Sequence, residues 1–327
     1  MIIVKTPLRI SFMGGGSDIP QFYKKSPGAT LSTAIDKYVY ICVNKKFDHH
    51  IRISYSETEI VDNVKKIKHS RAKACMQLTG VDKGIEIVTI ADIPSRGTGL
   101  GSSSSFTVGL LKALYAYKGQ TISEEQLANE ACEIEIQRLK EPIGKQDQFI
   151  ASYGGFKFMR YSPTGKVLVD YVMCDQNTIK KIEDSILLFY TGITRSTNIL
   201  LRKQIKGYKE KQKFSNTKKL VEMAFELKKQ LEKNNISSLG EMLHESWLLK
   251  KSLNDEISNN GIDQIYELAR KNGALGGKLL GAGGGGFFMV YAPPVKHEKI
   301  KNALKKYPVM PIRFEPEGSK VLFINKN

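Results

Sequence analysis

The ten residues RGTGLGSSSS, Arg96 to Ser105, place glycine at every second position before four consecutive serines. Apolar residues then recur at helical spacing, at Val108, Leu111 and Leu114, so we predict that the serines begin a helix. Glycine lets the backbone take positive φ angles and approach a ligand, and the free N–H groups of a helix N-terminus attract anions. Because a single serine is enough to cap a helix, this stretch predicts an anion-binding loop.

Two further glycine clusters lie on either side of this loop in the sequence: MGGGSD, ending at Asp18, and GGKLLGAGGGGFF, ending at Phe288. The second contains a G-x-G-x-x-G match at Gly281, Gly283 and Gly286, but it leads into the predicted strand FFMVY. A dinucleotide fingerprint must instead open a helix, and a Walker loop needs a Gly-Lys pair followed by Ser or Thr, which the chain lacks. We therefore expect a phosphate cradle of another design.

The length and the hydrophobic pattern predict a two-lobed α+β fold. The chain has 327 residues, 41% of them apolar, which is enough for a large core and favours two domains. Strand patterns return after residue 167, so we expect the domains to be 1–175 and 176–327. The predicted strands are 2–12, 37–47, 85–94, 185–193, 287–293 and 320–325, and the predicted helices are 56–80, 102–119, 123–139, 200–231, 238–253 and 262–271.

The charge balance is strongly basic, with 50 Lys and Arg against 33 Asp and Glu and a net charge of +17. Such a surface raises the local concentration of phosphorylated small molecules, while the lysine-rich run 200–220 is typical of a solvated helical face. The four cysteines are isolated, so we expect neither a zinc site nor a disulfide framework. No signal peptide and no run of ~18 apolar residues is evident, so we expect a cytoplasmic protein without a membrane partner.

The helix predicted over 123–139 carries an acid on its apolar side. It begins with a capping box, Ser123 followed by Gln126. Glu135 falls on the apolar row of this helix, whereas Glu133 points away from it. An acid on such a row is either an exposed edge residue or a functional one, and the spacing leaves both interpretations open.

The three glycine clusters together resemble the motifs of the GHMP kinase superfamily, which includes galactokinase, homoserine kinase, mevalonate kinase and phosphomevalonate kinase. PSRGTGLGSSSS, from Pro94, is similar to the family's P-x3-G-L-G-S-S phosphate motif, with one extra residue before Gly99. The segments TPLRISFMGGGSD and KLLGAGGGG resemble the first and third family motifs, in the same order. The resemblance implies a two-lobed kinase that uses ATP and Mg²⁺ and binds ATP and substrate in the cleft between its lobes.

The resemblance also implies roles for individual residues. The family's catalytic acid precedes a Gly-Gly pair by seven residues, which selects Asp147 before Gly154, and Arg9 is expected beside it. The family's magnesium-binding glutamate precedes a proline by seven residues, which selects Glu135, with Ser103 as its companion ligand and Ser102 as the second choice. Whether Asp147 acts as a base or positions the hydroxyl is left open. The residues expected to hold the ATP phosphates are Gly97, Gly99, Leu100, Gly101, Ser102, Ser103 and Ser104.

The substrate implied by the resemblance is a sugar phosphate. A mevalonate-type kinase has Lys where this chain has Arg9, and galactokinase-like members have a charged pair where it has Gly15 and Gly16 before Asp18. The segments resemble most the bacterial kinases that phosphorylate O1 of D-glycero-D-manno-heptose 7-phosphate to the 1,7-bisphosphate, toward GDP-heptose for surface polysaccharide. The further residues expected to bind the substrate are Lys145, Arg195 and Lys278 at its distal phosphate, and Gly283 and Gly284 in the closing loop.

Two rival functions are weighed against this expectation. A fucokinase-like or other sugar 1-kinase would share Asp147 and the glycine loop without needing a site for a distal phosphate. A nucleic-acid-binding protein on a kinase scaffold would explain the charge, but Glu135, Asp147 and all three glycine motifs are intact, so we expect no specific nucleic-acid partner. The sequence leaves the oligomeric state open, with a homodimer as one option.

Overall fold

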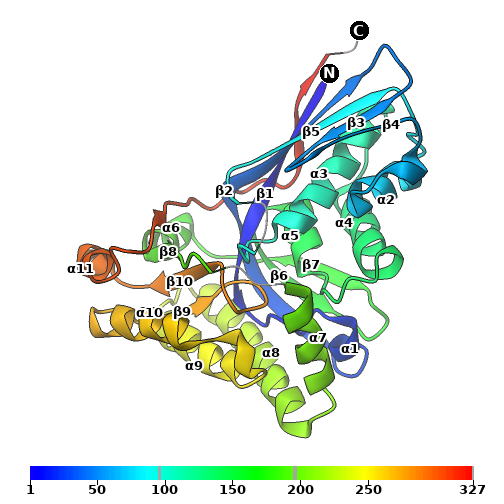
Figure 1. Ribbon diagram of the computed structural model, residues 1–327. Helices are drawn as coiled ribbons and strands as arrows, with labels where there is room; N and C mark the ends of the chain where they lie inside the picture. The colour runs from blue at the N-terminus through cyan, green and yellow to red at the C-terminus, as the bar shows by residue number, and fades with distance from the viewer. Residues whose placement is uncertain (95–96, 194–196, 326–327) are drawn as a thin grey trace.

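Two β-sheets with helices packed on them make up the computed structural model, which describes residues 1–94, 97–193 and 197–325 (Figure 1). The large sheet has the strand order β12-β1-β2-β5-β3-β4. In addition, β6 pairs with the first half of β2, and β7 pairs with β6. Its strands are β1 (Ile2–Met13), β2 (Gly28–Lys45), β3 (Ile51–Ser54), β4 (Thr58–Val61), β5 (Ile85–Ala91), β6 (Phe156–Tyr161), β7 (Val167–Tyr171) and β12 (Lys320–Ile324). The small antiparallel sheet is ordered β11 (Val309–Met310), β8 (Ile186–Tyr190), β10 (Phe287–Tyr291) and β9 (Gly276–Leu279).

Helices cover both sheets. The α-helices are α1 (Pro20–Tyr23), α2 (Ser70–Thr79), α3 (Ser102–Tyr117), α4 (Glu124–Cys132), α5 (Gln146–Tyr153), α6 (Gln176–Asp184), α7 (Thr197–Gly207), α8 (Lys211–Leu231), α9 (Leu239–Lys251), α10 (Asn260–Lys271) and α11 (His297–Ala303). Four short segments are 3-10 or π helices: η1 (Val64–Lys66), η2 (Glu133–Arg138), η3 (Asp255–Ile257) and η4 (Pro294–Lys296). No helix of the described residues combines the length and the apolar character that crossing a bilayer requires.

Strands β1 and β2 lie at the centre of the large sheet, and nearly every residue of β1 is buried. The 18-residue strand β2 pairs with β5 through its second half, 39–45, and with β6 through its first half, 28–33. Helix α3 lies against both β1 and β2, and Gly109 of α3 approaches Thr6 so closely that an added Cβ would lie 2.6 Å from the threonine Oγ1. The helix that carries the serines is therefore fixed on the central strands.

The sequence prediction that the serine run begins a helix is confirmed, and two other helix predictions need correction. Helix α3 starts at Ser102, directly after Gly101 in the left-handed region. The helix predicted over 56–80 is wrong in its first half, because residues 58–61 pair with β3 as β4; α2 occupies only Ser70–Thr79 and ends at Gly80, as expected. The helix predicted over 200–231 is two helices, α7 and α8, and strands β6 and β9 were not predicted.

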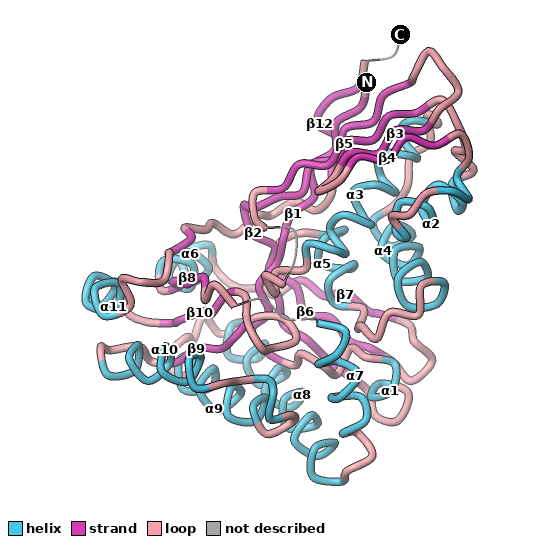
Figure 2. The backbone as a smooth tube through the Cα atoms, in the orientation of Figure 1, coloured by secondary structure: helices cyan, strands magenta, loops and turns pink. Residues whose placement is uncertain are grey.

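The end of the chain returns to its beginning. Strand β12 pairs antiparallel with β1 (Figure 2), and the Met1 amino group donates to the Asn325 carbonyl oxygen at 3.0 Å, so residue 325 lies beside residue 1. Helix α8 contributes Leu227 to the core of the large sheet and Leu220 to the core of the small one. The domain division at residue 175 stays a prediction, and the return of 320–324 to the first sheet shows that the chain crosses between lobes more than once.

Two glycine loops touch where the lobes meet. The loop before α3 contacts the loop between β9 and β10 so closely that a Cβ added at Gly99 would lie 2.4 Å from the Leu280 carbonyl oxygen. The Phe287 amide donates to the Thr98 carbonyl oxygen at 3.0 Å, which ties the two loops together. Gly99 has φ +77°, a backbone conformation that side chains with a Cβ rarely adopt.

We predict that Gly99→Ala lowers the free energy of unfolding more than Gly119→Ala. Gly119 has φ +72° with open space around it, so its substitution incurs only the cost of a left-handed residue, about 1–2 kcal/mol. Gly99→Ala adds the collision with Leu280, worth about another 1–3 kcal/mol. Urea unfolding of the two variants and the wild type measures the difference, and equal losses would contradict the close contact of the loops.

Candidate active site

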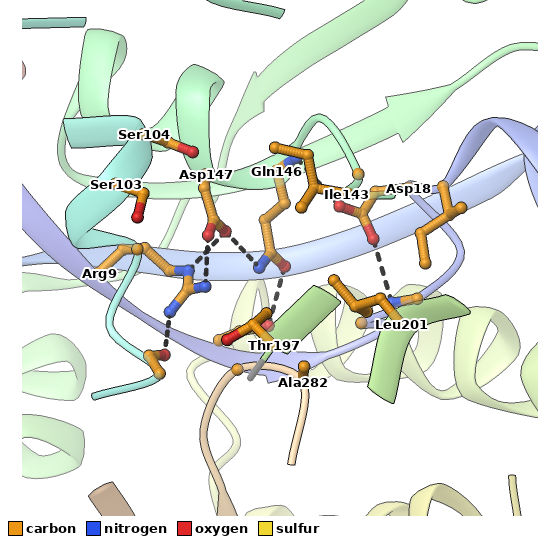
Figure 3. Close-up of a pocket in the computed structure, with 18 of the residues that line it drawn as sticks. Arg9, Asp18, Ser103, Ser104, Ile143, Gln146, Asp147, Thr197, Leu201 and Ala282 are labelled. Carbon is orange, nitrogen blue, oxygen red and sulfur yellow. Dashed lines mark hydrogen bonds and ion pairs between the residues drawn. The ribbon is translucent and has the colours of Figure 1, made fainter. Parts of the chain in front are cut away.

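A pocket opens where the two glycine loops, strand β1 and helices α3, α5 and α7 converge. Figure 3 shows Arg9, Gln146 and Asp147 side by side, with Ser103 toward one end and Asp18 toward the other. The arrangement brings together residues that lie far apart in the sequence. Further residues that line the pocket are Gly15, Gly16, Arg71, Gly97, Gly99, Gly101, Ser102, Ser104, Asn198, Lys250, Lys278 and Gly281.

An ion pair occupies the centre of the pocket. Arg9 donates from Nε to Asp147 Oδ1 at 2.7 Å and from Nη2 to Asp147 Oδ2 at 2.6 Å, the parallel geometry that suits a planar guanidinium. Its third nitrogen, Nη1, donates to the Gly99 carbonyl oxygen at 2.5 Å. The Arg9 side chain is 6% exposed whereas that of Asp147 is 26% exposed, so the carboxylate keeps access to the pocket. Arg9 therefore lies beside Asp147, as predicted.

Helix α5 positions Asp147 and adds a residue that the sequence reasoning missed. Asp147 lies in the first turn of α5, where the helix dipole stabilises a negative charge. Its neighbour Gln146 donates from Nε2 to Asp147 Oδ1 at 3.3 Å, while its Oε1 accepts from Ser11 at 2.8 Å and from Ser32 at 3.0 Å. The sequence held one signal for this contact: Ser11 lies two residues after Arg9 on one strand, so both side chains are on the same face of the sheet.

Asp18 sits at the other end of the pocket and is nearly buried. Its Oδ1 accepts from the Gly16 amide at 3.0 Å and its Oδ2 from the Gln146 amide at 3.1 Å. Burial raises the pKa of Asp18 above its ordinary value, and the negative charge of Asp147 adds to this effect. A Cβ added at Gly144 would lie 1.8 Å from Asp18 Oδ2, so glycine is required there. The glycines Gly15 and Gly16 line the pocket beside this carboxylate.

Glu135 is fully buried, and both of its oxygens accept hydrogen bonds. Its Oε1 accepts from Arg71 Nε at 2.8 Å and from Thr107 at 3.0 Å, and its Oε2 accepts from Ser104 at 2.8 Å and from Gln148 at 2.5 Å. An exposed edge position is therefore excluded for Glu135, and its functional role stays a prediction.

The serines of the loop point in different directions. Ser104, and not Ser103, contacts the Glu135 carboxylate, because consecutive residues of a helix are about 100° apart around its axis. Ser102 and Ser103 line the pocket together with Gly97, Gly99 and Gly101. Leu100 does not join them: it is fully buried, and only its carbonyl oxygen takes part, accepting from the Arg9 amide at 3.0 Å. The loop therefore presents its backbone and serines to the pocket and anchors itself through the leucine.

The two lysines predicted to bind a distal phosphate lie in different surroundings. The Lys145 ammonium turns away from the pocket, donates to the Gly165 carbonyl oxygen and lies over the ring of Tyr23. Lys278 does line the pocket, and Arg195 lies outside the described residues. Gly283 and Gly284 are absent from the lining, because η3 packs against them and the Gly284 amide donates to the Ile257 carbonyl oxygen at 2.9 Å.

Three cationic or polar lining residues were not found from the sequence. Arg71 reaches Glu135 from α2, a segment predicted to be one long helix. Asn198 of α7 donates to Glu141 at 2.5 Å. Lys250 of α9 donates to the carbonyl oxygens of the third glycine loop. Each comes from a helix whose position over the pocket depends on tertiary packing, and no local pattern marks it.

Comparison with known proteins places the chain in a family. It matches the model of the GHMP kinases N terminal domain over residues 48–155 and that of the GHMP kinases C terminal over residues 227–309. The chain is 32% identical to a D-glycero-alpha-D-manno-heptose 7-phosphate kinase of Campylobacter jejuni, with 98% of each chain covered. A bifunctional fucokinase/GDP-fucose pyrophosphorylase of Arabidopsis thaliana is 26% identical over 93% of this chain, which spans 31% of that longer protein.

Solved structures agree with the sequence matches. A D-glycero-D-manno-heptose 1-phosphate kinase from Bacteroides thetaiotaomicron superposes with a TM-score of 0.82, is 25% identical and is covered completely, as is this chain. A galactokinase of Lactococcus lactis is similar in fold, with a TM-score of 0.75 at 18% identity over 98% of this chain and 94% of that one. The expected two-lobed α+β kinase fold, in which ATP and substrate bind in the cleft, is confirmed. The chain belongs to the GHMP kinases and is a sugar phosphotransferase.

Proposed function

We propose that the protein transfers the γ-phosphoryl group of ATP to O1 of D-glycero-D-manno-heptose 7-phosphate. The observation that carries the proposal is the Arg9–Asp147 pair, which lies between the glycine loop and Asp18. The loop would hold the nucleotide at one end, Asp18 would bind the sugar at the other, and the carboxylate between them would receive the reacting hydroxyl. The 32% identity to a heptose 7-phosphate kinase supports this choice of sugar.

In the proposed reaction Asp147 orients the sugar hydroxyl and accepts its proton. The O1–phosphorus bond forms as the bond between the γ-phosphorus and its bridging oxygen breaks, and ADP leaves with the electron pair of that bond. Arg9 donates a hydrogen bond to each oxygen of Asp147 and so fixes the orientation of the carboxylate. The exposed fraction of the Asp147 side chain, 26%, leaves its carboxylate accessible to a hydroxyl.

The nucleotide would lie along the N-terminus of α3. The amides of Ser102, Ser103 and Ser104 and the backbone around Gly97 and Gly99 would hold the phosphates, as helix N-termini commonly do. A second hollow continues from Ser102 and Ser103 to the aromatic side chains of Tyr55 and Phe106. We infer that the base lies in this hollow, because flat apolar walls suit a purine ring.

Magnesium fits the donor set around Glu135. A buried carboxylate beside a serine hydroxyl offers the hard oxygen ligands that Mg²⁺ prefers, and nucleotide phosphates supply the rest in many kinases. We propose that Glu135 holds the metal with Ser103 or Ser104, where it would neutralise charge on the phosphates. Arg71, now paired with Glu135, also contacts Glu141 and so keeps a carboxylate partner when the metal takes Glu135.

The sugar would contact Asp18, Gly15 and Gly16. The distal phosphate needs a cation, and Arg195 and Lys278 stay predictions for that role, whereas Lys145 is directed elsewhere. A fucokinase-like activity is the second candidate, because fucokinases are among the relatives that match most of this chain. That reaction would use the same pocket without a distal phosphate. A homodimer stays a prediction.

The substrate panel is the first test. We expect turnover of D-glycero-D-manno-heptose 7-phosphate in a coupled assay of ADP release, with little turnover of mannose, fucose, galactose or mevalonate. The physical reason is that a buried cation tuned to a phosphate disfavours a substrate that leaves it unpaired. Equal turnover of an unphosphorylated sugar would retain the kinase and reject the distal phosphate site.

Asp147→Asn should reduce kcat by about 10²–10⁴-fold, because the amide cannot accept the proton from the hydroxyl. Asp170→Asn is the matched control: Asp170 of β7 forms a solvent-exposed ion pair with Arg160 of β6, so its loss should leave kcat unchanged. Steady-state kinetics with saturating ATP measures both. Wild-type turnover in Asp147→Asn would show that another group receives the proton.

Glu135→Gln should raise the Mg²⁺ concentration for half-maximal activity on the order of tenfold or more, because it removes a charged ligand. Glu133→Gln changes a neighbour in the same π-helical segment that is paired with Arg138 and partly exposed, so it should leave the Mg²⁺ dependence unaltered. Magnesium titrations of the kinase rate measure the shift. An unchanged midpoint in Glu135→Gln would remove Glu135 from the metal site.

A further inference from the structure

Two lysines line the pocket without a carboxylate to neutralise them. Lys278 of β9 is 4% exposed and donates from Nζ to the Phe12 carbonyl oxygen at 2.9 Å. Lys250 of α9 donates from Nζ to the carbonyl oxygens of Leu279 at 3.1 Å and Gly281 at 2.5 Å. Within the described residues neither ammonium forms a salt bridge, whereas Arg9 and Arg71 each do.

The hydrogen-bond capacity of these ammonium groups is not used up. An ammonium carries three N–H donors. In the described part of the chain, two donors of Lys250 and one donor of Lys278 have partners. One donor of Lys250 and two donors of Lys278 therefore have none there. A buried cation with free donors is costly unless an anion completes its environment. The two lysines therefore mark a place where the protein is short of negative charge.

The location of Lys250 indicates which anion this is. Lys250 holds the Gly281 carbonyl, and a Cβ added at Gly281 would lie 2.6 Å from Gly99 Cα in the loop before α3. Gly99 in turn accepts a hydrogen bond from Arg9, the partner of Asp147. Lys250 thus lies at the glycine-loop end of the pocket, near the reacting centre.

The charges in the pocket point the same way. Burial and, to a smaller extent, the positive charge of Arg9 lower the pKa of Lys250 to about 7, while burial and the charges of Lys250 and Arg9 lower the pKa of Lys278. Burial is the larger cause of both shifts, and the neighbouring cations add to it because neither lysine has a carboxylate partner among the described residues. A bound phosphate would place a negative charge beside the lysines and oppose these shifts.

We propose that Lys250 binds the transferable phosphoryl group of the nucleotide with its third N–H donor, while Lys278 keeps the role proposed for it at the distal phosphate of the sugar. The proposal rests on the placement of ATP along α3. Lys250 also anchors the third glycine loop, so one side chain would contact both that loop and the γ-phosphate. An ammonium held by two carbonyl oxygens has its remaining donor directed, which suits a single phosphate oxygen.

Nucleotide binding in the absence of sugar tests the proposal. Calorimetric titrations compare ADP with AMP-PNP, a non-hydrolysable analogue that carries a third phosphoryl group, in one magnesium-containing buffer. Lys250→Met should weaken AMP-PNP about 10–100-fold, as expected for loss of a charged hydrogen bond, and leave ADP within about twofold of the wild type. Lys250→Arg should recover part of the loss. Lys251→Met is the matched control, because Lys251 pairs with Asp263.

A second measurement on the wild-type protein covers the case in which Lys250→Met does not fold. Acylation of lysines by an amine-reactive ester, located by mass spectrometry, should be blocked at Lys250 by AMP-PNP and not by ADP, with Lys251 labelled equally in both.

Three results would overturn the proposal: an unchanged ratio of AMP-PNP to ADP affinity in Lys250→Met, equal protection of Lys250 by the two nucleotides, or a loss confined to the KM for the sugar phosphate. Failure of the wild type to bind either nucleotide would instead reject the proposed function, which separates the two outcomes.

Discussion

The three hydrogen bonds of the Arg9 guanidinium hold the pocket together. Two go to Asp147 at the start of α5, and the third goes to the Gly99 carbonyl oxygen in the loop before α3. One side chain of a buried strand thereby fixes the reacting carboxylate relative to the loop expected to hold the nucleotide. Phosphoryl transfer depends on alignment more than on covalent chemistry, so the rigidity of this connection matters for the rate. A lysine there could not make the same three directed contacts, because an ammonium lacks the planar fork.

Much of the site could be predicted because its signals are local or belong to a family motif. The serine run follows glycines with positive φ, and a helix begins there as expected. Asp147 and Glu135 were selected by spacing to a glycine pair and a proline, and both lie at or beside the pocket. Lys250 and Gln146 could not be predicted, because their roles depend on hydrogen-bond partners that no local pattern reveals. The partners of Gln146 on β1 and β2 lie more than a hundred residues away, and those of Lys250 lie at the next strand, β9, and the loop after it. The helix predicted for residues 58–61 was wrong for a related reason, because these residues form a strand that pairs with β3.

Glu135 shows how local irregularity serves the site. It lies in η2, a π-helical turn that follows α4 without a break. A π turn widens the helix and shifts the direction of its side chains, which is why such turns recur at functional sites. Here the shift accompanies a carboxylate that four donors hold in the interior, facing the N-terminus of α3.

The pairing of β12 with β1 has a consequence for how the protein is made. Strand β1, which carries Arg9, leaves the ribosome long before β12, the strand that pairs with its other edge. Until β12 has been made, β1 therefore has unpaired N–H and C=O groups along that edge, and exposed strand edges are sites of aggregation. The long-range pairing also raises the loop-closure cost of the large sheet. We expect this edge to be the segment of the nascent chain that most needs protection until β12 has been made.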